Sequence, residues 1–78
     1  MDEEVFNLEL RKFLKKFGIT AQRGIEKAVQ RGIQSGTLTG AETLTVRARL
    51  AIDGLPPEIV VEGSIGLSWP APHGPDPV

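Results

Sequence analysis

Residues 15–32 read KKFGITAQRGIEKAVQRG, and this stretch decides how many helices the chain forms. Two lysines followed by Gly18 are typical of a helix C-terminus, and Thr20 is a good N-cap for a following helix. The residue three positions after Thr20 is Arg23 rather than glutamate or glutamine, so the capping box is incomplete. The stretch therefore predicts two helices joined by a three-residue corner at residues 18–20.

The segment before the corner has the pattern of an amphipathic helix. Asp2 is placed to cap it, and Glu3 and Glu4 occupy its first turn, where negative charge offsets the positive end of the helix dipole. Apolar residues recur on one face at about 100° per residue. This face consists of Phe6, Leu10, Phe13, Leu14 and Phe17.

The segment after the corner carries a second apolar face, made of smaller residues. Gly24 and Gly32 each cost about 1 kcal/mol relative to alanine inside a helix, so this helix needs tertiary support. Gly36 is expected to end it. The face consists of Ala21, Ile25, Ala28, Val29, Gly32 and Ile33.

Two later segments alternate between apolar and polar residues, as half-buried strands do. The first is TLTVRARLAID at 43–53, and the second is EIVVEGSIGL at 58–67. Between them, GLPP at 54–57 supplies the glycine and proline of a turn. The pattern predicts an antiparallel hairpin whose inward residues are Leu44, Val46, Ala48, Leu50 and Ile52 on one strand and Ile59, Val61, Ile65 and Leu67 on the other.

The strand register follows from the loop length. Pairing Asp53 with Glu58 across a four-residue loop aligns the apolar positions and sets Arg49 opposite Glu62, which is a favourable cross-strand pair. A slip of two residues would keep the faces but lose that ionic match. The predicted register is therefore a preference rather than a unique solution.

The expected fold is α+β, with two helices packed on one face of an antiparallel β-hairpin (α-α-β-β). A lone two-stranded sheet is marginal in water and both its edges are open, so we expect a homodimer that pairs the sheets edge to edge. Residues 1–68 form the single expected domain. Residues 69–78 form a proline-rich tail that is extended or disordered, unless Trp69 anchors it to a surface.

Composition limits the classes of protein. The chain has 78 residues, a net charge of −1 and no cysteine, which excludes disulfides and thiolate metal sites and fits a reducing compartment. The acidic N-terminus is no signal peptide, and no apolar run is long enough to span a membrane. We expect a cytoplasmic protein.

The chemistry-bearing residues are few. The one histidine, His73, lies in the proline-rich tail, where no rigid scaffold holds a general base. No serine is accompanied by an activating base, and no phosphate-binding glycine motif occurs. An enzyme, a cofactor and a metal site are therefore not expected.

The second predicted helix carries a polar arc with the residue types of a DNA-reading helix. Arginine can contact guanine and glutamine can contact adenine, while Lys12, Lys15 and Lys16 could contact phosphates. A hairpin after two helices also matches the order of a winged helix-turn-helix domain. Against this stand the negative net charge, the absence of a third helix and two helical glycines. The arc consists of Arg23, Lys27, Gln30, Arg31 and Gln34.

A separate candidate surface lies opposite the first apolar face. Val5 and Leu8 fall there beside Lys12, either as two tolerated surface residues or as a patch for a protein partner. Trp69 is the remaining candidate for a protein contact. The leading hypothesis is a non-catalytic interaction or accessory module that binds protein partners as a homodimer. The alternative is a winged-helix-like nucleic-acid-binding regulator.

The segment FNLELRKFLKKFGITAQRGIEKAVQRGI at 6–33, followed by IDGL at 52–55 and VVEG at 60–63, resembles a family of short, mostly proteobacterial proteins of unknown function. The resemblance covers about residues 3–67. It implies a small stand-alone cytoplasmic bacterial protein, and it brings no activity, cofactor or site residues.

Overall fold

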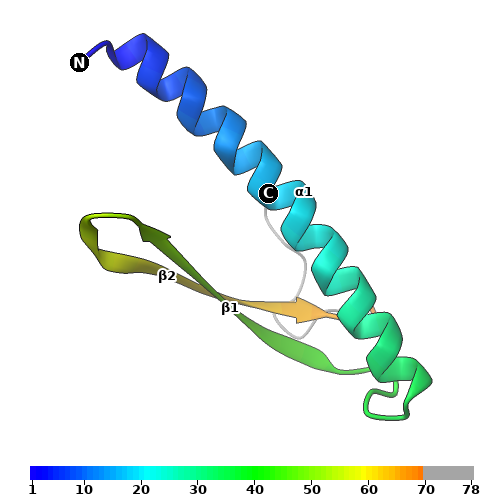
Figure 1. The fold of residues 1–78 in the computed structure, drawn as a ribbon. Helices are drawn as coiled ribbons and strands as arrows, with labels where there is room; N and C mark the ends of the chain where they lie inside the picture. The colour runs from blue at the N-terminus through cyan, green and yellow to red at the C-terminus, as the bar shows by residue number, and fades with distance from the viewer. Residues whose placement is uncertain (70–78) are drawn as a thin grey trace. The chain divides into compact units, whose positions relative to one another are not determined.

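A computed structural model describes residues 1–69, which form one helix and one β-hairpin (Figure 1). The helix α1 spans Glu3–Gln34, and the strands are β1 at Thr43–Ile52 and β2 at Leu55–Gly66. The chain divides into two compact units, Met1–Thr37 and a second that begins at Leu38. The α+β class and the hairpin are confirmed. The proline-rich tail, with His73, falls outside the described residues apart from Trp69, and the division at residue 68 stays a prediction.

The predicted corner at residues 18–20 is wrong, because α1 runs through it as one helix of 32 residues. Gly18 does not take the positive φ of a helix-ending glycine. A glycine inside a helix costs only about 1 kcal/mol, whereas a break leaves up to four N–H and four C=O groups without helical partners. With no proline nearby and no complete capping box at Thr20, continuing the helix is the less costly solution.

Continuity joins the two predicted apolar faces into one stripe. Its eight central positions span 26 residues in seven steps, an average of about 3.7 residues per step, close to the helical repeat of about 3.6. The stripe therefore follows the helix axis with little drift. We call it the apolar stripe, and its central positions are Phe6, Leu10, Phe13, Phe17, Ala21, Ile25, Ala28 and Gly32.

Both ends of α1 have local caps. The Asp2 carboxylate accepts hydrogen bonds from the backbone N–H groups of Glu4 (3.0 Å) and Val5 (3.1 Å), as its position predicted. At the other end, the Ser35 N–H donates to the Arg31 carbonyl (2.9 Å), and Gly36 takes a φ of 81°. That conformation is costly for residues other than glycine, so the predicted end near Gly36 is confirmed.

The hairpin pairs two residues away from the predicted register. Leu44 lies opposite Ile65, and Glu62 lies opposite Arg47 instead of Arg49. The slip of two residues preserves both faces, and it recovers an ionic match because the Arg47 Nε lies 3.1 Å from the Glu62 Oε1. Both side chains are about half exposed, so this pair contributes at most about 1 kcal/mol.

The turn explains the register. The sequence predicts a four-residue loop, but Ile52 pairs with Leu55, leaving only Asp53 and Gly54 between the strands. Gly54 has a φ of 80°, which suits an Asp-Gly turn. The predicted loop included Pro56 and Pro57, but in the structure both lie inside β2. The pairing there is irregular, because three residues of β2 (Pro56, Pro57 and Glu58) face one residue of β1. Prolines lack the N–H needed for regular pairing, which makes this the natural place for a bulge.

The alternation of the two strands is confirmed on β1 and in part on β2. Leu44, Val46, Ala48 and Leu50 are half-buried, and each is followed by an exposed residue. On β2 the half-buried position is Ile65, and Leu67, just beyond the strand, is half-buried too. Ile59 and Val61 are exposed, as is Ile52 at the end of β1.

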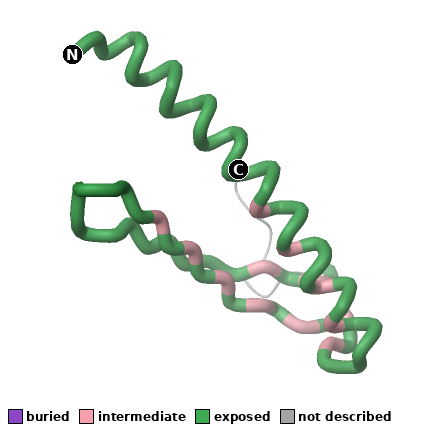
Figure 2. Tube along the Cα trace, in the orientation of Figure 1, coloured by how far each residue is buried: buried purple, intermediate pink, exposed green. Residues whose placement is uncertain are grey.

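Within residues 1–69, no side chain is buried (Figure 2). The half-buried residues of α1 are Ala21, Ile25, Val29 and Gly32, all on the apolar stripe, while every residue before Ala21 is exposed. The large side chains at the N-terminal half of the stripe are among these exposed residues.

Replacing Gly18 with alanine tests the continuous helix. In a helix interior the substitution removes the glycine penalty, so we expect higher helicity by circular dichroism and a gain of roughly 1 kcal/mol in the free energy of unfolding. Apart from its chain neighbours and the nearby backbone of α1, nothing lies within 4 Å of where a Cβ at Gly18 would be. Gly36→Ala is the control, because the φ of 81° penalises alanine there. Loss of helicity in Gly18→Ala would contradict the continuous helix and support the corner.

Candidate interaction surface

The N-terminal half of the apolar stripe exposes five large apolar side chains, those of Phe6, Leu10, Phe13, Leu14 and Phe17. Phe13 and Phe17 stack with ring centroids 6.4 Å apart and an angle of 14° between their planes. Phe6 and Phe13 are each 50% exposed, and Leu14 is 47% exposed. Aromatic and leucine side chains at this spacing on one helix face are typical of a helix that packs against another element. The sequence predicted these residues as core, and they are exposed.

The predicted nucleic-acid residues lie together on one exposed arc of α1, on the side away from the apolar stripe. The continuous helix extends this arc toward the N-terminus, since Lys12 and Lys16 fall on the same side at about 100° per residue. It also removes the helix-turn-helix geometry, because the two helices of that motif are one helix here. The predicted residues are Arg23, Lys27, Gln30, Arg31 and Gln34, all exposed.

The predicted protein-binding residues Val5 and Leu8 are exposed by 54% and 57% and share a helix side with Lys12. The continuous helix adds Ile19, which is 46% exposed and was not singled out from the sequence because it fell in the supposed corner. A shallow hollow of about 360 Å³ lies beside Ile19 and the neighbouring lysines. Trp69, 76% exposed, belongs to the other unit of the chain.

A polar cluster before β1 forms around Glu42, which sequence reasoning did not single out. Its carboxylate accepts hydrogen bonds from the Thr39 N–H (2.8 Å), the Thr39 hydroxyl (3.0 Å) and the Gly40 N–H (3.0 Å). Chiefly through the bond from the Thr39 N–H, and against a smaller desolvation effect, the pKa of Glu42 falls from 4.5 to about 2. The Glu42 carbonyl accepts a bond from the Leu67 N–H (2.9 Å). Glu42 thus closes the loop onto the end of the hairpin.

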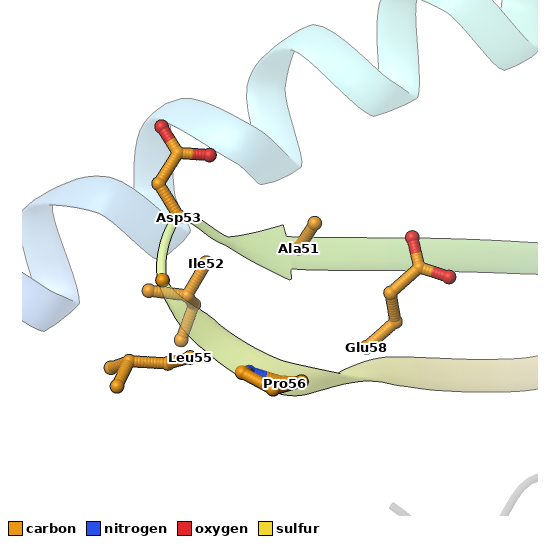
Figure 3. A pocket seen from close by; sticks show the side chains of 7 residues that line it. Ala51, Ile52, Asp53, Leu55, Pro56 and Glu58 are labelled. Carbon is orange, nitrogen blue, oxygen red and sulfur yellow. The ribbon is translucent and has the colours of Figure 1, made fainter.

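The hairpin tip has an open hollow of about 290 Å³ (Figure 3). Asp53 and Glu58 are among its lining residues, and their carboxylates point to the same side in that view. Arg49 approaches Glu58 with its Nη1 3.9 Å from the Oε1, so one of the two carboxylates already has a cationic neighbour. The hollow follows from the tight turn and the bulge, and nothing in it selects a ligand.

Within residues 1–69, no group of three histidine, cysteine, aspartate or glutamate side chains is placed to hold a metal ion. No helix among these residues is both long enough and apolar enough to span a membrane.

Residues 1–68 match DUF6494, a family of unknown function. The chain belongs to this family. The match includes all of α1, β1 and β2, so the predicted resemblance to a family of unknown function is confirmed. No curated protein and no solved structure matches this DUF6494 chain.

The Glu42 cluster predicts a pH dependence for this DUF6494 protein. Because the folded pKa of about 2 lies below the ordinary 4.5, the carboxylate stabilises the loop above about pH 4.5, and this contribution is lost as the pH falls through about 2. We expect the Thr39 and Gly40 amide proton resonances to move with a midpoint near pH 2 in an NMR titration. In Glu42→Gln these amides should show no such midpoint. A midpoint near 4.5 in the wild-type chain would contradict the hydrogen-bonded geometry.

Proposed function

We propose that this protein is a non-catalytic interaction module that works as a homodimer and binds through the apolar stripe of α1. The supporting observation is the stripe itself, uninterrupted over the length of the helix, with three half-exposed phenylalanines in its N-terminal half. A helix with such a stripe in water is stabilised when another apolar surface covers it. The absence of cysteine supports a cytoplasmic setting.

The free energy gained by covering the apolar stripe supports dimerisation over chance exposure. A whole phenylalanine side chain covers about 200 Å², so covering the exposed half of Phe13 removes about 100 Å² from water. That is worth about 2.5 kcal/mol at about 25 cal/mol per Å². Scattered single apolar residues on a surface need no partner, but here five large ones share one face of one helix.

Replacing Phe13 with glutamate tests the stripe. We expect the wild-type chain to sediment as a dimer at micromolar concentration and Phe13→Glu to sediment as a monomer, because a buried carboxylate without a partner is costly. The dimer dissociation constant should rise at least tenfold in analytical ultracentrifugation.

Leu8→Glu is the matched control, since Leu8 has a similar exposure but lies on the side of α1 away from the stripe. This variant should remain a dimer. If Leu8→Glu dissociates the dimer and Phe13→Glu does not, the Val5, Leu8 and Lys12 face is the binding surface. A wild-type monomer at all concentrations would refute the homodimer.

The second candidate function is nucleic-acid binding, supported by the exposed basic arc that the continuous helix lengthens. In this form the helix would bind mainly through phosphate contacts, since the helix-turn-helix geometry that would aim it at base edges is missing.

An NMR titration with a mixed-sequence DNA duplex tests this candidate. Binding through the arc should shift the amides near Arg23, Lys27 and Arg31 at low salt and lose most of the affinity at moderate salt, because bound phosphates release counterions. The amide of Thr45 on β1, which is not part of α1, serves as an internal reference. Spectra that do not move at near-millimolar DNA would eliminate the candidate.

A further inference from the structure

The apolar stripe of α1 changes character along its length. Its N-terminal half presents large side chains, namely Phe6, Leu10, Phe13, Leu14 and Phe17, and its C-terminal half presents smaller ones. In that half the central positions Ala21, Ala28 and Gly32 have little or no side chain. Small residues on a helix face allow a close approach by bulky side chains of a partner. Each half is therefore a poor match for itself and a good match for the other.

The charge of α1 is divided in the same way. Residues 2–9 carry four acids and no base, a charge of −4, and residues 11–34 carry seven bases and one acid, a charge of +6. The helix dipole is positive at the N-terminus of α1 and negative at its C-terminus. The dipoles of two helices lying side by side therefore attract each other when the helices run in opposite directions. Two parallel copies would place acid beside acid and base beside base.

We infer that α1 pairs with α1 of a second copy of the chain in the antiparallel orientation, with residue n of one copy near residue 35 − n of the other. This inference rests on the proposed homodimer and names its interface and orientation. The arrangement sets Phe6 near Val29, Leu10 near Ile25 and Leu14 near Ala21 of the second copy. The N-terminal half of each stripe therefore faces the C-terminal half of the other, and Phe17 lies near its own counterpart at the centre.

The same arrangement matches charges beside the stripe. Glu9 and Lys27 fall on the same flank of the helix at about 100° per residue, and in the antiparallel pair Glu9 of one copy lies within one residue of the level of Lys27 in the other. Twofold symmetry gives this pairing twice. Glu9 has only a weak contact in its own chain, since its Oε1 is 3.9 Å from the Lys12 Nζ and both side chains are exposed.

The available area is sufficient for a specific interface. The five large side chains of the N-terminal half are 40–50% exposed. Taking about 200 Å² for each whole side chain, two copies would bury about 900 Å² from these residues alone. The surfaces that cover them bring the total above the roughly 1,000 Å² that a specific interface needs.

Spin-label distances between the two copies test the orientation. The natural chain has no cysteine, so Asn7→Cys and Gly18→Cys each accept one label at a known site. Asn7 is exposed beside the stripe, and a Cβ at Gly18 would meet nothing within 4 Å apart from its chain neighbours and the nearby backbone of α1. In the antiparallel pair the two labels at residue 7 lie 21 residues apart along the axis, which is about 32 Å at about 1.5 Å per residue. The two labels at residue 18 lie at nearly the same level, separated mainly by the roughly 8–10 Å between helix axes.

The expected result is a long distance for Asn7→Cys and a short one for Gly18→Cys, both abolished by dilution with unlabelled chain. Short distances at both positions would mean parallel helices and would overturn the orientation while leaving the homodimer intact. Long distances at both positions would place the dimer contact elsewhere, with the open hairpin edges as the next candidate. If neither Asn7→Cys nor Gly18→Cys gives a measurable distance between labels, and the chain sediments as a monomer in ultracentrifugation, the proposed homodimer itself is refuted.

Discussion

The backbone hydrogen-bond ladder of α1, unbroken through residues 18–20, is the constraint on which the rest of the helical unit depends. A break there would leave terminal N–H and C=O groups unpaired and would require a second costly helix nucleus. Keeping the glycine inside the helix costs only about 1 kcal/mol. Continuity carries the apolar stripe from Phe6 to Gly32 without interruption, and it places the basic arc on the same rigid element.

The absence of any buried side chain within residues 1–69 gives the helix stripe its importance. Chains shorter than about 70–80 residues seldom obtain more than about 3–5 kcal/mol from a single core, and oligomerisation is one of the established remedies. If the stripe is covered by a second copy, folding stability depends on protein concentration. The interaction surface and the source of stability would then be the same residues.

Polar contacts in the second unit act locally. Glu42 binds the backbone of Thr39 and Gly40 and holds the start of β1, while its carbonyl contacts Leu67 beyond β2. Asp53 and Gly54 make a turn two residues shorter than the proline-containing segment suggests, and that turn sets the register. The resulting Arg47–Glu62 contact is a consequence of the register more than its cause, since an exposed ion pair contributes little.

Several elements could be read from residue patterns because their causes are local. The Asp2 cap, the helix end near Gly36, the strand alternation and the exposure of the Arg23 arc depend on side chains within a few positions of each other. The continuity of the helix through residues 18–20 could not be predicted in this way, because Gly18 and Thr20 are compatible with both a helix end and a helix interior. The signal that favoured the interior was the stripe spacing of Phe17, Ala21 and Ile25 across the supposed break.

The sequence by itself determined the α+β class, the two faces of the hairpin, the large-to-small change along the helix and the separation of its charges. Only the three-dimensional structure decided that one helix replaces two, that Ile52 pairs with Leu55, and that the large residues of the stripe stay exposed. The reason is physical. Local propensities near residue 18 differ by about 1 kcal/mol, and registers two residues apart bury the same faces, so the backbone hydrogen bonds of the whole element select between them.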